Sequence, residues 1–338
     1  MKSKLRIWIA ELRAPFLTAT LVSIFLGTAI AWARNDAFNL EYFLLALLGG
    51  VFLHLGANVA NDYFDHKSGN DEVNKEFVRP FSGGSRTIQL GLLSPREVLG
   101  GALLFYAAAI LIGAYFALTV GAFVLILGLV GVLSGFFYTA PFLNWASKGV
   151  GEALVGINFG ALMTLGAFYV QTGMVSLEPL AASIPVSLLI AAVLYINEFP
   201  DYVADKTVGK RTLVVRWGRA KAVYAYAAIV LGAYVFVLLN VVLGITPPQV
   251  LFALIPLPLA VEGVRHALRF HSEPYRLVPA NALNIVFHLL TSLLLSCGYL
   301  VYSFELGSIA SYSVMAVVGV CALLTVHFYL KTRKPPPP

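Results

Sequence analysis

Hydrophobic positions in this 338-residue chain gather into long runs, and short polar loops separate one run from the next. A helix needs about 20 apolar residues to cross about 30 Å of hydrocarbon, and most of the runs approach that length. The pattern therefore predicts an all-α fold, a polytopic transmembrane helical bundle that forms a single membrane domain over residues 1–338. The ten predicted spans lie at roughly 15–33, 40–62, 97–117, 119–140, 150–170, 179–200, 220–243, 247–263, 279–303 and 308–330.

The loops between these spans differ in charge, which predicts how the chain is oriented. Cytoplasmic loops of membrane proteins carry an excess of Lys and Arg. If both termini are cytoplasmic, 22 of the 23 Lys and Arg residues fall on that side, and only Arg34 falls on the outer side. A count of nine spans would instead place Lys331, Arg333 and Lys334 outside. The sequence thus predicts ten spans in a multi-pass protein of the cell membrane.

Composition agrees that the bilayer is the solvent of this chain. Hydrophobic residues make up 59% of it and charged residues 12%, against about 25% charged residues in soluble domains. The net charge of +6 comes from short loops rather than from one basic face, which excludes nucleic acid as a partner and favours lipid headgroups or a phosphorylated substrate. Nothing in the sequence indicates an obligate protein partner.

The loop after the second span is rich in carboxylates and amides and reads NVANDYFDHKSGND at 58–71. If that span stays helical to its end, residues spaced four, three and four apart share one face: His54, Asn58, Asn61 and Asp65. Such a face at the membrane edge is costly unless a charged ligand satisfies it, and oxygen-rich clusters suit Mg²⁺. The alternative is a solvated loop with ordinary interface polarity.

A second loop of this kind follows the sixth span and reads NEFPDYVADKTVGKRTLVVRWGR at 197–219. Asn197, Asp201 and Asp205 are each four apart, and Lys210 and Arg211 follow them. Two carboxylate clusters on one membrane face, each with cations nearby, are what a diphosphate site needs. Metal ions bridge carboxylates to phosphates, and Lys or Arg neutralises the remaining charge.

The two motifs resemble those of the UbiA superfamily of intramembrane prenyltransferases. In the first loop the resemblance rests on NDYFD at 61–65 and on GND at 69–71. In the second loop it rests on NxxxDxxxD at 197–205 and on GKRTL at 209–213. The variants at 69–71 and 209–213 look most like the 1,4-dihydroxy-2-naphthoate polyprenyltransferases of menaquinone biosynthesis.

The resemblance covers about residues 15–303 and implies a UbiA-type nine-helix catalytic core there. The segment at 308–330 would then be an additional, tenth transmembrane helix. Two departures from the family pattern concern the phosphate contacts. Phe199 and Pro200 stand where related enzymes often carry a basic residue. A basic residue that relatives commonly carry soon after the tyrosine of the loop between the fourth and fifth spans is absent, and Lys148 is the nearest substitute.

Members of this superfamily ionise an allylic polyprenyl diphosphate and join its prenyl group to an aromatic acceptor. The resemblance therefore implies a Mg²⁺-dependent prenyltransferase that uses two ions and whose active site faces the cytoplasm. The catalytic carboxylates would be Asp62, Asp65, Asp201 and Asp205. The metal ligands would be these four with Asn61, Asp71 and Asn197. The substrate contacts would come from Arg13, Asn58, Asn61, Lys67, Arg86, Tyr138, Lys148, Asn197, Lys210 and Arg211.

Other functions remain open at this stage. A transporter would place ionisable groups near the bilayer midplane, whereas the carboxylates here lie at the membrane edge. A UbiA-type enzyme for another acceptor, or a terpene cyclase, could use the same metal site with a different pocket. A third polar stripe at Asn281, Asn284 and His288 could line the acceptor end of a cavity or form hydrogen bonds between helices.

Overall fold

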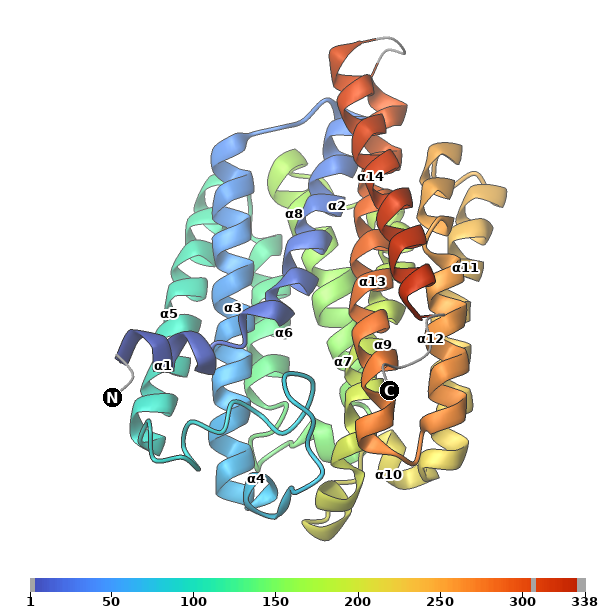
Figure 1. Cartoon of the computed structure of the whole chain (residues 1–338). Coiled ribbons are helices and arrows are strands. Elements are labelled where there is room, and N and C mark those ends of the chain that lie inside the picture. Colours follow the sequence, from blue (N-terminus) through green and yellow to red (C-terminus); the bar gives the residue numbers. More distant parts are fainter. Residues whose placement is uncertain (1–3, 305–307, 333–338) are drawn as a thin grey trace.

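Long helices lie side by side along most of the molecule (Figure 1). The computed structural model describes residues 4–304 and 308–332. Its elements are α1 (Lys4–Glu11), η1 (Ala14–Leu17), α2 (Thr18–Asn35), α3 (Leu40–Ser68), α4 (Asn70–Val73), α5 (Pro95–Thr119), α6 (Phe123–Phe136), η2 (Trp145–Lys148), α7 (Gly151–Gly156), η3 (Ile157–Leu162), α8 (Met163–Thr172), α9 (Leu177–Thr207), α10 (Leu213–Trp217), α11 (Arg219–Val242), η4 (Pro248–Leu254), α12 (Leu257–Phe270), α13 (Pro274–Ser303) and α14 (Ile309–Thr332).

The all-α membrane bundle predicted from the sequence is confirmed. Eight helical segments within the described residues are long and apolar enough to cross a membrane. Two of the ten predicted spans lie outside that set. The run at 119–140 forms only the 14-residue α6, because the chain turns at Gly121 before it. The run at 15–33 forms η1 and the 18-residue α2, which ends in the polar residues Arg34 and Asn35.

Helices α3 and α9 extend further than their apolar runs. The predicted spans end at 62 and 200, whereas α3 continues to Ser68 and α9 to Thr207. Gly69, at φ 77°, ends α3 in the left-handed region that favours glycine. Both carboxylate motifs therefore lie on the last turns of long helices, and helical spacing fixes which side chains point the same way.

The interior of the bundle is built around α13, which packs against α2, α9, η4, α12 and α14. Asn281 and Asn284 of α13 bind other helices: Asn281 Nδ2 donates to Asn197 Oδ1 at 2.7 Å, and Asn284 Oδ1 accepts from Tyr226 Oη at 2.8 Å. His288 instead lines the internal cavity. The third polar stripe thus divides between the two roles that the sequence left open.

Small residues let certain helices approach closely, as in other membrane bundles. A Cβ at Gly27 of α2 would overlap the carbonyl oxygen of Thr164 in α8. A Cβ at Gly160 of η3 would overlap Ser187 Oγ in α9. The two glycines therefore let α2 and α9 pack closely against the span formed by α7, η3 and α8.

One end of the bundle carries both carboxylate motifs. The loop from 69 to 94 covers this end, α4 and α10 lie there, and α1 crosses the bundle nearby (Figure 1). On another side, α14 packs against α12 and α13. Within the part of the chain that the structure describes, α14 contributes no residue to the internal cavity.

Candidate active site

A cavity of about 710 Å³ runs from the carboxylate motifs into the bundle. Asp65, Asp71, Asp201 and Asp205 line its polar end. Apolar residues of α5 and α6 line much of the remainder, and both the size and the mixed lining are typical of a pocket for an organic ligand. The cavity therefore suits a substrate with a charged head and a long apolar tail.

The backbone of the loop at 83–85 packs against the first carboxylate of the motif, Asp62. Asp62 is buried, accepts a hydrogen bond from the Ser85 N–H at 2.9 Å, and lies 3.7 Å from Arg13 Nη1. Its Oδ1 atom has no hydrogen-bond partner among the described residues. A Cβ at Gly84, where φ is 66°, would lie 3.1 Å from Asp62 Oδ1 and 3.4 Å from Asp71 Oδ2. Because Gly84 has no side chain, it leaves space for a ligand between the carboxylates of Asp62 and Asp71.

Lys210 joins the two motifs. Its Nζ atom lies 3.5 Å from Asp65 Oδ2 and 3.7 Å from Asp205 Oδ1, and the side chain is mostly buried. Burial alone would lower the pKa of Lys210, but the carboxylates of Asp205 and Asp65 outweigh it and raise that pKa well above its usual value. Lys210 is therefore a permanent cation at the polar end of the cavity.

Two amides of the first loop hold the carboxylates of the second motif. Asn70 Nδ2 donates to Asp205 Oδ1 at 3.0 Å, and Asn74 Nδ2 donates to Asp201 Oδ1 at 2.6 Å. Both amides are carried by α4 and its C-terminal cap, directly after the turn at Gly69. The sequence analysis missed them because a helix of one turn shows no periodic pattern.

The carboxylates at this end lie close enough to affect one another. Burial, and then the charges of Asp65 and Asp62, raise the pKa of Asp71 to about 8, although Lys210 and Arg86 oppose the shift. In the described residues, no three His, Cys, Asp or Glu side chains are grouped so as to hold an ion alone. Mg²⁺ fits such a site, because it usually combines one or two carboxylates with water and substrate phosphates.

Glu11 ties α1 to the loop beside the site. Its carboxylate accepts hydrogen bonds from Ser85 Oγ at 2.5 Å and from Thr87 Oγ1. Burial, and then the charge of Asp62, raise the pKa of Glu11 to about 7, against the effect of the two hydroxyls. Glu11 was not among the predicted site residues, so this contact was not predicted.

The structure brings together some of the predicted site residues and separates others. The four residues of the predicted polar face of α3 all line the cavity. The predicted substrate contacts that line the cavity are Arg13, Asn58, Asn61, Tyr138, Asn197 and Lys210. Those that do not are Lys67, Arg86, Lys148 and Arg211.

The four predicted substrate contacts outside the cavity differ in their exposure and their neighbours. Lys67, Arg211 and Lys148, the last of these in η2, are exposed. Arg86, at φ 61°, places its guanidinium 4.4 Å from the ring centroid of Phe77. The predicted cations are therefore divided between residues that line the cavity and residues that lie outside it.

Two buried glutamates near the site were not predicted to take part. Glu198 lines the cavity next to Asn197, and its Oε2 atom has no hydrogen-bond partner in the described residues. Glu152 Oε1 accepts the Leu213 N–H at 2.8 Å. Because Leu213 begins α10, this bond anchors the turn that carries Lys210.

Comparisons with known proteins agree with this architecture. The profile of the UbiA prenyltransferase family matches residues 20–278. The 1,4-dihydroxy-2-naphthoate octaprenyltransferase of Haemophilus influenzae is 31% identical, over 89% of this chain and 98% of its own length.

Two solved structures share the fold. The apo structure of a UbiA homologue from Aeropyrum pernix K1 has a TM-score of 0.60 and 17% identity, and the match covers 85% of this chain and 97% of that one. The structure of a UbiA homologue from Archaeoglobus fulgidus bound to DMAPP and Mg²⁺ has a TM-score of 0.50 and 17% identity, over 96% of this chain and 98% of that one.

Proposed function

The chain belongs to the UbiA prenyltransferase family, and from this premise we propose that it transfers a polyprenyl group from an allylic diphosphate to 1,4-dihydroxy-2-naphthoate. The observation that carries the proposal is the meeting of two carboxylate motifs around Lys210 at the polar end of an apolar cavity. The name of the Haemophilus influenzae relative supports the acceptor. Family membership removes the transporter alternative.

The polar end suits a diphosphate and Mg²⁺. Two Mg²⁺ ions would be held by the two motifs. Asp62 Oδ1, which lies beside Gly84 and accepts no hydrogen bond although Arg13 Nη1 is 3.7 Å away, would be a ligand for one of them. The bound ions would stabilise the negative charge that develops on the departing diphosphate. The Mg²⁺ named with the Archaeoglobus fulgidus homologue supports this part of the proposal. The proposed ligands are Asp62, Asp65, Asp71, Asp201 and Asp205 with Asn61 and Asn197.

The side chains of this protein have three tasks in such a reaction. Lys210 and Arg13, both at the cavity, neutralise phosphate oxygens that carboxylates would otherwise repel. Asn70 and Asn74 hold the second-motif carboxylates in place. The apolar walls on α5 and α6 bind the prenyl tail and exclude water, which would otherwise capture the allylic cation.

We place this end of the bundle on the cytoplasmic side. The loops at 69–94 and 208–218 carry six Lys and Arg residues, and in the ten-span orientation 22 of the 23 Lys and Arg residues fall on this side. Prenyl diphosphate is a water-soluble head on a lipid tail, so a cytoplasmic mouth and an intramembrane cavity accommodate both parts.

The test is direct. Purified full-length protein is incubated with geranylgeranyl diphosphate, Mg²⁺ and a panel of acceptors, and products are identified by mass spectrometry. We expect a prenylated naphthalene formed with loss of the carboxylate as carbon dioxide. Turnover of 4-hydroxybenzoate or a glyceryl phosphate with none of the naphthoate would refute the acceptor. A cyclised product that forms without any acceptor would identify a terpene cyclase instead.

A further inference from the structure

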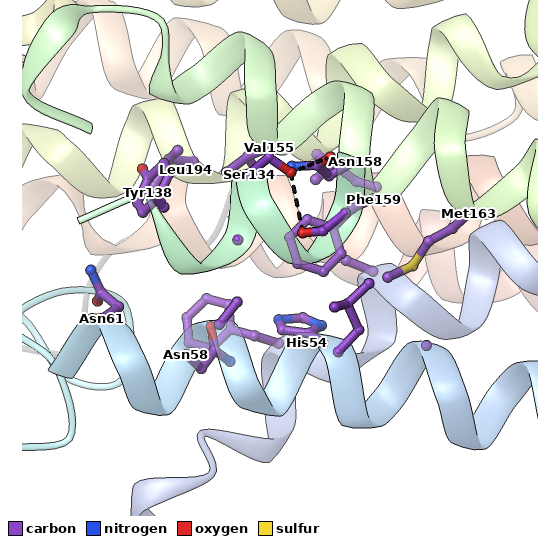
Figure 2. A pocket seen from close by; sticks show the side chains of 18 of the residues that line it. His54, Asn58, Asn61, Ser134, Tyr138, Val155, Asn158, Phe159, Met163 and Leu194 are labelled. Atoms are coloured by element: carbon purple, nitrogen blue, oxygen red, sulfur yellow. Dashed lines mark hydrogen bonds between the residues drawn. The ribbon is translucent and has the colours of Figure 1, made fainter. Parts of the chain in front are cut away.

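Four of the polar side chains that line the cavity beyond the carboxylates lie on two facing walls, where most of the lining is apolar. They are carried by three segments, α3 on one wall and α6 with η3 on the facing wall (Figure 2). Polar groups inside a membrane bundle are costly, and they mark a functional site by default. The four residues are His54, Asn58, Ser134 and Asn158.

The hydrogen bonds within this group leave part of its capacity unused. Ser134 Oγ donates to Asn158 Oδ1 at 2.9 Å, and His54 Nδ1 lies 2.8 Å from Thr20 Oγ1. Asn58 Nδ2 is buried and has no hydrogen-bond partner in the described parts of the chain. An unpaired buried amide is unfavourable, so a bound ligand with an oxygen atom would satisfy it.

The facing wall has an unusual backbone at this point. The span that begins at Gly151 changes to a π-helix over Ile157–Leu162, and Asn158 lies inside that segment. Single π-helical turns occur often at functional sites. Gly160 of the same turn is pressed against Ser187 of α9. Packing against α9 therefore fixes the π-helical turn, while Asn158 lines the cavity.

The substrates of prenyl transfer have three parts: the diphosphate, the prenyl tail and the acceptor. The position and chemistry of these four residues exclude the first two parts as their ligand. Along α3, Asn58 lies about 6 Å and His54 about 12 Å from Asp62, at a rise of about 1.5 Å per residue. His54 is therefore beyond the reach of a diphosphate held by the carboxylates. A prenyl tail offers no hydrogen-bonding atoms. The acceptor is the part that remains.

We propose that His54, Asn58, Ser134 and Asn158 form the acceptor subsite and that it takes a planar aromatic compound with hydroxyl groups on opposite edges of one ring. This inference rests on the proposed prenyl transfer to an aromatic acceptor. Polar groups on facing walls suit oxygens on opposite ring edges. The ring centroid of Phe159 lies 4.3 Å from that of His54, so Phe159 adds an aromatic surface beside His54.

The experiment compares Asn158→Leu with Asn240→Leu in the full-length protein. Asn240 is a buried amide of α11 that donates to the Ala181 carbonyl at 2.8 Å and does not line the cavity. We expect Asn158→Leu to raise the KM for the acceptor about tenfold, the size of one lost hydrogen bond. The KM for prenyl diphosphate should change less than about twofold. Asn240→Leu should change neither constant.

A second measurement keeps the test independent of folding. Monodeoxy analogues of the acceptor lack one hydroxyl oxygen, and binding of each analogue without prenyl diphosphate is followed by fluorescence quenching. One analogue should bind the wild type about tenfold more weakly than the parent compound. The same analogue and the parent should bind Asn158→Leu equally.

The outcomes separate the two proposals. If the wild type prenylates an aromatic acceptor but Asn158→Leu raises both KM values together, or only that for prenyl diphosphate, the subsite is wrong and the proposed function stands. If the wild type prenylates only aromatic compounds without hydroxyl groups on opposite ring edges, the subsite proposal is wrong while prenyl transfer to an aromatic acceptor stands. If it prenylates no aromatic compound, both proposals fail.

Discussion

Replacing Asp65 by Asn tests the diphosphate site most directly. The substitution keeps the size of the side chain and an oxygen that can accept the hydrogen bond from Asn61 Nδ2, now 3.2 Å long. It removes the negative charge that faces Lys210 at 3.5 Å and that a divalent cation requires. We expect turnover to fall sharply in a protein that remains folded.

The structure indicates the size of both effects. At 3.5 Å the gross attraction between Asp65 and Lys210 is about 5 kcal/mol for an effective dielectric constant of about 20. Lys210 keeps a second partner, Asp205, at 3.7 Å, and the repulsion between Asp65 and Asp71 disappears. The free energy of unfolding should therefore change by only about 1 kcal/mol. Loss of one preorganised electrostatic contact lowers turnover by about 10²- to 10³-fold, and a metal ligand can exceed that range.

The assay measures steady-state rates over a range of Mg²⁺ concentrations at saturating prenyl diphosphate, together with thermal unfolding. Glu273→Gln is the matched control, because Glu273 is exposed, pairs with Arg276 at 3.0 Å and lies outside the cavity. Exposed pairs of this kind contribute about 0–1 kcal/mol, so the control should keep its activity. Wild-type turnover of Asp65→Asn at limiting Mg²⁺ would show that the reasoning about the two motifs is wrong.

Four further predictions follow from the same geometry. Gly84→Ala should lower turnover at least tenfold in the same rate assay, because the new Cβ would lie 3.1 Å from Asp62 Oδ1 at a positive φ. Asn74→Leu removes the 2.6 Å bond to Asp201 and should raise the Mg²⁺ concentration needed for half-maximal rate by about tenfold; an unchanged Mg²⁺ titration would contradict it. Glu152→Leu should raise the KM for prenyl diphosphate, whereas Glu152→Gln, which can still accept a hydrogen bond, should restore it. A reporter fused to the C-terminus should be accessible only from the cytoplasm, and labelling from outside would contradict the orientation.

The features that the sequence predicted well are those with a periodic or additive signal. Apolar runs predict the bundle because each span must bury its own backbone hydrogen bonds in lipid. The face from His54 to Asp65 could be predicted because α3 stays helical through the motif, and helical spacing then decides which residues share a side. Helical continuation past the apolar run also explains why the predicted ends of α3 and α9 were too early.

The rest of the site depends on contacts between segments far apart in the chain. Asn70 and Asp205 are 135 residues apart, and their hydrogen bond exists only because α4 folds over the end of α9. Glu152 lies at the start of the predicted span at 150–170 and was not predicted as a site residue, yet its bond to Leu213 fixes the turn that holds Lys210. A carboxylate next to an apolar run gives no signal of which backbone N–H it will meet.

At the end of the bundle away from the carboxylate motifs, a contact between distant segments changes how two charged residues are interpreted. Arg34 is the one Lys or Arg that the ten-span orientation places outside, and Glu178, taken from the sequence alone, is a free carboxylate of an outer loop. In the structure the two form an ion pair, with Arg34 Nη2 2.8 Å from Glu178 Oε1, and Tyr299 Oη donates to the same oxygen at 3.0 Å. The pair is neutral as a unit and joins α2, α9 and α13. Because the rule that orients the chain counts Lys and Arg rather than net charge, Arg34 stays its one exception, and the ion pair gives that exception a structural role.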